Sequence, residues 1–200
     1  FQSNHSDALA LTVGTVNPSD KVKVQSALAV YASLTEDAKS ALTTEKSLLD
    51  SLLVEINLQE DILSAEALVV IAESSNRQTD LDAAQVLVTA LPSSTEKTAL
   101  QDRLDLVQYT IDYIAQLQSA TEAVVQAETS YLQTDLDTAQ VLVTALPSNT
   151  EKAALQERLD AVQDVIDVET ASQLITSYFE SNSVVVSRYN SSTIKENAFI

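Results

Sequence analysis

The sequence lacks cysteine and has only one glycine and three prolines in 200 residues. Without cysteine the chain cannot form disulfides, thiolate metal sites or a cysteine nucleophile. Proteins built from β-strands need frequent turns, and turns use glycine and proline. Because both residues are scarce, the composition favours long helices joined by short connections. Hydrophobic residues make up 45% of the chain, which is enough for a packed core.

Basic residues are also scarce, since 11 lysines and arginines stand against 29 aspartates and glutamates and leave a net charge of −18. They are scattered and form no patch. Such a surface repels phosphate groups, so neither nucleic acid nor an anionic lipid surface is an expected partner. It keeps the chain soluble and favours a monomer. No apolar run approaches the roughly 20 residues that a spanning helix needs, so membrane insertion is not expected.

Groups that carry catalysis are few. His5 is the only histidine, and there is no glycine-rich phosphate loop. Chance pairs among 29 acidic residues are near certain, so a carboxylate pair alone does not indicate acid–base catalysis. The sequence therefore predicts a protein that is not an enzyme and binds no cofactor. Residues 1–4 resemble a tag scar, the remnant of a cleaved affinity tag, and are left out of the fold prediction.

One stretch of the chain occurs twice. Residues 78–108 read QTDLDAAQVLVTALPSSTEKTALQDRLDLVQ, residues 133–163 read QTDLDTAQVLVTALPSNTEKAALQERLDAVQ, and 26 of the 31 positions are identical at an offset of 55. The similarity extends upstream, where residues 69–73 match residues 124–128 at four of five positions. A tandem repeat this close indicates one supersecondary unit used twice, which is typical of an array of modules.

Each copy carries signals for a short helix followed by a long one. Thr79-x-x-Asp82 resembles a capping box that starts the short helix, and Pro92 ends it because the residue before proline avoids helical geometry. Ser93-x-x-Glu96 then caps a helix whose apolar residues recur at spacings of three and four to about residue 130. The second copy repeats these signals at Thr134, Asp137, Pro147, Ser148 and Glu151.

The N-terminal quarter has its own helix signals. Residues 17–20 (Asn-Pro-Ser-Asp) combine an N-cap, a proline in the first turn and an acid three residues after the cap. They predict a helix that continues to about residue 34. A short helix restarts at Thr35, and a helix of about 30 residues follows from Thr43 or Thr44.

These elements predict an all-α fold of tandem antiparallel three-helix bundles. A short helix between two long ones cannot bury its apolar stripe alone, so each long helix should close one bundle and open the next. The predicted bundles are residues 5–58, 59–110 and 111–180, arranged as an elongated rod with spectrin-like connectivity. Residues 181–200 are predicted to form a tail, which either straps the last bundle or starts a further module. Residues 184–186 of this tail favour a strand.

Two stretches resemble known bacterial modules. Residues 11–53 are similar to a helical module of Gram-positive surface proteins and secreted enzymes, through Leu11, Val16, Asp20, Lys21, Val24, Ala27, Tyr31, Leu34, Thr35, Lys39 and Leu42. The 55-residue units are similar to tandem helical repeats of Gram-positive cell-surface and toxin-like proteins, through Asp80, Asp82, Ala84, Leu87, Val88, Ala90, Leu91, Lys97, Leu100, Arg103 and Leu104. The resemblance implies an extracellular, wall-associated setting and supplies no site.

Three tyrosines are the candidate partner contacts, because aromatic residues dominate interface hot spots. Tyr109 and Tyr113 lie one helical turn apart, and Tyr131 follows the same long helix; all three lie outside the near-identical stretch. If exposed they could anchor a protein partner. If buried they fill the junction between bundles, which is the interpretation we favour.

The acidic and basic residues of the repeat suggest weaker candidates. Asp80-x-Asp82 and its copy lack the glycine and the further ligands of an EF-hand, so no metal site is predicted and calcium is left as an alternative. Acids in a first turn also interact favourably with the helix dipole. Ion pairs are expected for Lys97 with Glu96 or Asp102, for Arg103 with Asp80 or Asp105, and for the repeated Lys152 and Arg158.

The pattern as a whole predicts a non-catalytic spacer or stalk from an extracellular, wall-associated Gram-positive protein. The alternative is an adhesin-type three-helix module that binds a host or cell-wall protein. A third possibility is a helical segment of a secreted toxin or enzyme. An exposed apolar or aromatic patch would favour the binding module over the spacer.

Overall fold

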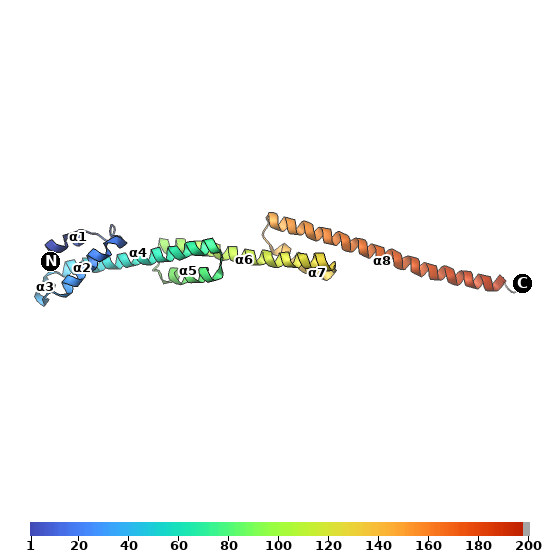
Figure 1. Ribbon diagram of the computed structural model, residues 1–200, viewed down its shortest axis with the longest axis horizontal. Coiled ribbons are helices and arrows are strands. Elements are labelled where there is room, and N and C mark those ends of the chain that lie inside the picture. The colour runs from blue at the N-terminus through green and yellow to red at the C-terminus, as the bar shows by residue number, and fades with distance from the viewer. Residues whose placement is uncertain (198–200) are drawn as a thin grey trace. The chain divides into compact units, whose positions relative to one another are not determined.

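The computed structural model describes the backbone of residues 1–197 and the side chains up to Asn182, and within that part of the chain every regular element is helical (Figure 1). This confirms the predicted all-α class. The elements are the 3₁₀ turns η1 (Gln2–His5) and η2 (Pro18–Asp20) and the helices α1 (Ser6–Leu9), α2 (Lys21–Ala32), α3 (Glu36–Ala41), α4 (Thr43–Ser75), α5 (Gln78–Ala90), α6 (Thr95–Ser130), α7 (Gln133–Ala145) and α8 (Thr150–Asn197).

The chain divides into two compact units, Phe1–Ile111 and Asp112–Ile200. The division falls inside α6, which continues as one helix from Thr95 to Ser130. The domain boundaries predicted from the sequence stay predictions, because the packing shows which residues share a core and not where a domain ends.

The N-terminal core joins α1, α2 and the first half of α4. Its buried residues are Ala8, Val16, Val24, Ala27, Leu49, Leu52 and Ile56. Phe1 packs against this core, and its ring centroid lies 5.0 Å from that of His5 and 6.2 Å from that of Tyr31. The origin of residues 1–4 stays a prediction, but leaving them out of the fold was wrong because Phe1 supplies apolar surface to the first core.

Two further cores have the same design. The first, formed by α4, α5 and α6, contains Ala65, Val69, Ala72, Leu81, Ala84, Val88, Leu91, Leu100, Leu104 and Val107. The second, formed by α6, α7 and α8, contains Ala120, Val124, Ala127, Leu136, Ala139, Val143, Leu146, Leu155, Leu159 and Val162. Each residue of the first list maps onto an identical residue 55 positions later. We call residues 58–111 the first module and residues 113–166 the second module.

Figure 1 shows how each module is built, with the short helix lying beside the long ones. In the first module α5 packs on the second half of α4 and the first half of α6. In the second, α7 packs on the second half of α6 and the start of α8. One long helix therefore contributes to two cores, as the sequence predicted.

Several helix ends differ from the predicted caps. Neither Thr79 nor Thr134 caps its helix, since α5 and α7 begin one residue earlier with no side-chain cap. The caps of α6 and α8 lie one residue later than predicted. Ser94 Oγ accepts a hydrogen bond from the Lys97 amide at 3.1 Å, and Asn149 Oδ1 accepts one from the Lys152 amide at 2.9 Å. In both cases the capping residue is the one directly before the first residue of the helix.

The predicted N-terminal caps hold. Asn17 caps η2 with its side chain, and Asp20 completes the capping box by accepting from the Asn17 amide at 3.3 Å. Lys23 Nζ lies 2.8 Å from Asp20 Oδ1, and this hydrogen bond lowers the pKa of the buried Asp20 carboxyl. Thr35 caps α3 by accepting from the Ala38 amide.

The tail is helical rather than extended, which corrects the strand preference predicted for residues 184–186. The backbone of α8 continues through them to Asn197, because helix propagation from a formed helix outweighs the weak strand preference of valine. Residues 198–200, part of the predicted tail, lie outside the described residues. None of the described helices has a stretch long and apolar enough to cross a bilayer.

Candidate protein-binding face

The three candidate tyrosines have three different surroundings. Tyr109 is 59% exposed on α6, whereas Tyr113 is half-buried against the core of the second module. Tyr131 is 50% exposed and follows the last residue of α6. Tyr113 lies on α6, 18 residues before Tyr131, and this separation is roughly 27 Å at the helical rise. The tyrosines therefore form no single aromatic patch.

Tyr113 has a specific partner within its module. The Asn149 side-chain amide donates a hydrogen bond to the Tyr113 hydroxyl at 2.6 Å. The equivalent residues of the first module are Leu58 and Ser94, which cannot make this bond. Asn149 and Tyr113 thus both differ from their counterparts in the first module, and Tyr113 packs within its own module.

Tyr131 has an uncommon backbone conformation, with φ at 51°. The left-handed region is unfavourable for a bulky side chain, and Asn76 at the same place in the first module suits it better. Tyr131 lines a groove of about 400 Å³ together with Val165, Ile166, Glu169, Thr170 and Gln173. Its ring is therefore beside α8 and accessible.

The acidic pairs of the short helices make local hydrogen bonds. Gln78 Nε2 donates to Asp82 at 2.8 Å, and Gln133 Nε2 donates to Asp137 at 2.9 Å. The pKa of Asp135 is lowered, chiefly by a hydrogen bond from Ser130 and then by one from Gln126. Among the residues that the structure describes, no three histidines or acids are grouped so that they could hold a metal ion.

The predicted ion pairs have other partners than expected. Arg103 Nε lies 2.8 Å from Glu73 Oε1, and Arg158 Nη2 lies 2.8 Å from Glu128 Oε2. Each pair joins the first and third helices of its module, and each arginine hydrogen bond lowers the pKa of its glutamate. Sequence spacing pointed to the nearest acids along the chain, but a guanidinium on this side of the third helix faces the first helix.

The two repeated lysines cap helix ends. Lys97 Nζ donates to the carbonyl oxygens of Thr89 and Leu91, both at 2.7 Å. Lys152 Nζ donates to those of Thr144 and Leu146 at 2.6 and 2.8 Å. A cation at the negative end of a helix dipole satisfies carbonyls that have no partner within the helix. These contacts replace the pairs predicted with Glu96 or Asp102.

Glutamine pairs join the short helix to the third helix. Gln78 with Gln108 and Gln85 with Gln101 exchange reciprocal amide hydrogen bonds of 2.7–3.2 Å. The second module has the same pairs with distances of 2.7–3.3 Å, namely Gln133 with Gln163 and Gln140 with Gln156. Together with the lysine cap, they fix the short helix and so orient its outer side.

The outer side of the short helix is similar in the two modules. We define the outer face as four of its exposed residues: Thr79, Asp82, Val86 and Thr89 in α5, and Thr134, Asp137, Val141 and Thr144 in α7, next to the exposed Ala83 and Thr138, which differ. All four residues are identical between the copies. Val86 is 68% exposed and Val141 is 70% exposed, although valine gains nothing from solvent and is a modest helix former.

A small groove adjoins each outer face. In the first module it has about 140 Å³ and is lined by Asp61, Ser64, Leu87, Ala90 and Leu91. In the second it has about 290 Å³ and is lined by Ala115, Gln116, Ser119, Leu142 and Ala145. The serine, leucine and alanine positions correspond at the 55-residue offset. An exposed valine beside a recurring apolar groove is an arrangement suited to a protein contact.

The sequence could have located this face. Val86 falls opposite the stripe of Leu81, Ala84 and Val88 on a helical wheel, so its exposure follows from the period of 3.6 residues. The tyrosines were predicted as candidate contacts from their aromatic character, whereas helical position predicts the exposure of Val86.

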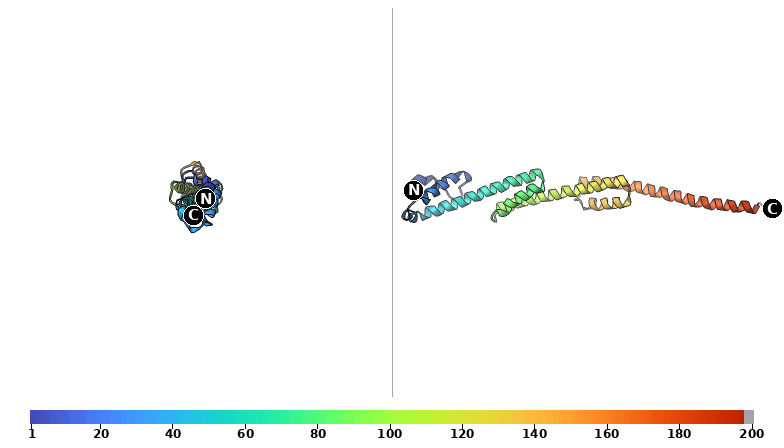
Figure 2. Two further views of the ribbon diagram at one scale, coloured as in Figure 1. Left: turned by 90° about the vertical axis from the view of Figure 1, so that its left-hand side faces the viewer. Right: turned by 60° about the horizontal axis from the view of Figure 1, so that its bottom comes forward.

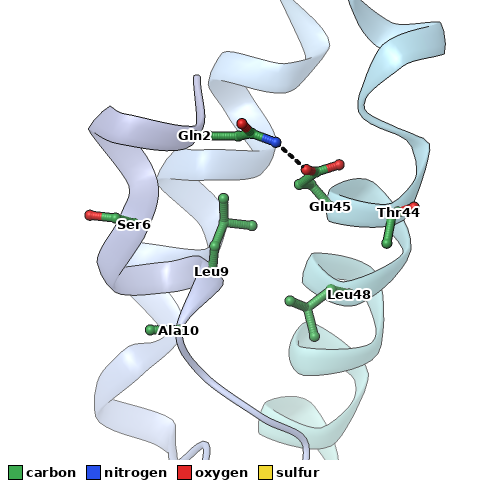
Figure 3. A pocket seen from close by; sticks show the side chains of 7 residues that line it. All are labelled: Gln2, Ser6, Leu9, Ala10, Thr44, Glu45 and Leu48. Atoms are coloured by element: carbon green, nitrogen blue, oxygen red, sulfur yellow. Dashed lines mark hydrogen bonds between the residues drawn. The ribbon is translucent and has the colours of Figure 1, made fainter.

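A larger hollow lies at the N-terminus. It has about 530 Å³ and is lined by Gln2, Ser6, Leu9, Ala10, Thr44, Glu45 and Leu48. Figure 3 shows Gln2 reaching from η1 toward α4, where its amide donates to the Glu45 carboxylate. The one carboxylate of the lining is thus engaged within the chain, and the hollow offers no catalytic grouping.

Comparison with known proteins finds similarity for part of the chain. Residues 115–173, the second module and the helix just after it, match the family model of the GA-like domain, a helical module of Gram-positive surface proteins. The Minor extracellular protease Epr of Bacillus subtilis (strain 168) is 45% identical over 69 residues, which is 34% of this chain and 10% of that protease. No solved structure matches the chain.

Both comparisons point to an extracellular protein of a Gram-positive bacterium. The family match confirms that the second module resembles helical modules of Gram-positive surface proteins, and the resemblance stated for residues 11–53 stays a prediction. The family match covers less than a third of the chain, and the matched relative shares only a tenth of its length. The role of the whole protein is therefore a matter for proposal.

Proposed function

We propose that this chain is a non-catalytic, protein-binding segment of a wall-associated Gram-positive surface protein, and that the outer faces of α5 and α7 are its contact surfaces. The supporting observation is the recurrence of the outer-face residues. Four exposed residues recur identically, including valines that are 68% and 70% exposed. Burial explains why the two cores are identical, but it does not explain identity at exposed positions.

Within the near-identical stretches 78–108 and 133–163, the positions of the five differences support this proposal. Four of them fall at residues 94, 98, 102 and 106 and at their counterparts 149, 153, 157 and 161. A spacing of four places them on one side of the third helix, whereas the short helix differs only at Ala83 and Thr138. Within these stretches the four residues of the outer face are unchanged, whereas the exposed residue beside them differs, being Ala83 in α5 and Thr138 in α7.

Two identical faces on one chain would act together. A partner with two sites, or a surface carrying many copies of a partner, would gain from the raised effective concentration after the first contact. The partner would be a host or wall protein. Albumin is the first to test, since GA-like domains bind other proteins such as albumin.

The test uses the full chain immobilised on a sensor, with serum albumin and then fractionated serum as the probes. V86D and V141D each place a charge at the centre of one outer face, and we expect each to weaken binding and the double variant to lower affinity at least tenfold, since central anchors carry most interface energy. V22D is the matched control, because Val22 is 75% exposed and lies outside the modules. Unchanged binding by the double variant would refute the proposed face.

A spacer role is the second candidate, and the continuity of α6 supports it. This helix supplies Leu100, Leu104 and Val107 to one core and Ala120, Val124 and Ala127 to the next. We propose that such sharing resists bending and makes the chain a stalk.

D112P tests the spacer role, because proline inside a helix kinks or breaks it at the division of the two units. T170P, in the part of α8 beyond the second module, is the control. The maximum dimension from small-angle scattering should fall for D112P and change less for T170P. A wild-type chain that scatters as a compact sphere would exclude the spacer.

A further inference from the structure

The second half of α8 leaves the second module and presents a broad apolar face. All described residues of α8 from 167 to 182 are exposed. Val168 is 70%, Leu174 65%, Ile175 58%, Tyr178 66% and Phe179 66% exposed. Figure 2 shows this part of α8 continuing past α7 without another helix at its side. We call Val168, Ala171, Leu174, Ile175, Tyr178 and Phe179 the acceptor face.

The repeat register shows what covers a face at this place. Ile175 and Phe179 occupy the positions of Ala120 and Val124 on α6 and of Ala65 and Val69 on α4, which are all fully buried. At the same offset, the polar Ser172 and Asn182 stand where Leu117 and Ala127 pack on α6, so the apolar face of α8 is turned slightly from that of α6. On α4 the cover is α5 with the start of α6, and on α6 it is α7 with the start of α8. In both modules a hairpin of a short and a long helix closes over the equivalent face.

The width of the acceptor face agrees with a cover of two helices. At 100° per residue, its six residues span an arc of about 140°. A single partner helix needs only the narrow seam of a two-stranded coiled coil, whereas a helix packed in a bundle carries a stripe wider than about 100°. A second copy of α8 lying along this face would leave part of it exposed.

The central side chains of the acceptor face are larger than those at the equivalent positions of α4 and α6, so the hairpin that covers it must differ from the two hairpins of the modules. Isoleucine replaces alanine at position 175, and phenylalanine replaces valine at position 179. Extra volume at the centre of a tightly packed core forces its neighbours aside unless they are smaller. The cover must therefore supply less volume than the α7–α8 hairpin, in which Val143 and Leu159 are fully buried.

From these observations we propose that the acceptor face binds a helical hairpin of short-helix and long-helix type whose central side chains are smaller than those of α7 and α8. The proposal concerns a surface different from the outer faces, so it does not depend on the proposed albumin-type contact. It assigns the partner by its shape and apolar character.

The test replaces residues 188–200 with a copy of residues 133–166, which keeps the 55-residue register. One chain carries the copy unchanged, and a second carries V143A and L159A in the added copy only. Amide hydrogen exchange of residues 168–182 is the measurement. We expect exchange to slow at least tenfold in the chain with the smaller hairpin, and to slow less in the chain with the unchanged copy.

I175D with F179D, made in the chain that carries the smaller hairpin, is the matched control. Both positions are exposed, so the second module should stay folded while the added protection is lost. The proposal is overturned if neither hairpin slows exchange, or if the unchanged copy protects better than the smaller one. It is also overturned if the natural chain alone shows protection that rises with its concentration, because a second copy would then be the occupant.

Discussion

The two modules have the same buried core and differ mainly along their first helix. Ten buried residues of the first correspond to ten identical residues of the second, as do the lysine cap, the glutamine pairs and the arginine–glutamate pair. Most changes lie along the first helix, where residues 58–77 and 113–132 are identical at only seven of 20 positions. Leu58 and Ser94 in the first module become Tyr113 and Asn149 in the second. A module can therefore vary much of its first helix and its cap while the buried core stays the same.

The largest effect should come from the equivalent leucines at the centres of the two cores. Leu104 and Leu159 are each 1% exposed. Leu104→Ala and Leu159→Ala should each lower the free energy of unfolding by about 2–5 kcal/mol, through lost burial and a residual cavity. Chemical denaturation monitored by circular dichroism measures both. Losses that differ by more than about 1 kcal/mol would show that the identical cores are not energetically equivalent.

The lysine caps should have the next largest effect. K97M and K152M keep the apolar stem but remove two charge-assisted hydrogen bonds to helix-terminal carbonyls, so each should cost about 1–2 kcal/mol of unfolding free energy. K46M is the control, because Lys46 forms a surface pair with Asp50 four residues away, worth roughly 0.5 kcal/mol or less. Thermal unfolding of all three variants, compared with wild type, tests the ranking. If K97M lowers the unfolding free energy no more than K46M does, the lysine cap does not stabilise the module.

These cases show what the sequence could and could not predict. The 55-residue repeat and the 3.6-residue period located the helices and the core, because burial leaves a regular pattern in one dimension. The partners of Lys97 and Arg103 were predicted wrongly, because both reach across to residues on other helices. Spacing along the chain says nothing about which neighbouring helix a long side chain meets.

The N-cap of α6 is a second feature that spacing along the sequence did not predict. Ser93 and Ser94 are chemically alike, and only the backbone geometry decides that Ser94 accepts the hydrogen bond. The link between Asn149 and Tyr113 spans 36 residues, so no local motif could reveal it. It becomes visible in the sequence only when both modules are aligned and their differences are compared in pairs.

A double-mutant cycle measures that link. Y113L and N149S convert the second module toward the first, and their coupling energy should be about 0.5–1.5 kcal/mol, the value of one hydrogen bond. N149S retains a capping side chain, so the single change isolates the contact with Tyr113. The reverse pair, L58Y with S94N, should be better tolerated together than either change alone. Coupling near zero in both modules would mean that the two substitutions arose independently.

The smallest expected effect is on the pH dependence of stability, and it compares the Arg103–Glu73 pair with the Arg158–Glu128 pair. Arginine hydrogen bonds lower the pKa of Glu73 and of Glu128. A carboxyl group whose pKa is lower in the folded chain stabilises the fold above its unfolded pKa, about 4.3 for glutamate, and this stabilisation is lost as pH falls through the folded pKa. Both pairs are partly exposed, so each should contribute less than about 1 kcal/mol.

The modules should differ in this pH response because Arg103 has a second acid within reach, Glu66 at 3.7 Å, where the second module has Thr121. E128Q leaves Arg158 without that reserve, so it should lower stability at pH 7 more than E73Q does. Both variants should lose less stability than wild type between pH 6 and pH 3, as measured by urea unfolding at each pH, with E157Q as the exposed control. An E73Q loss equal to that of E128Q would mean that Glu66 contributes nothing, and the two pairs would then be energetically the same.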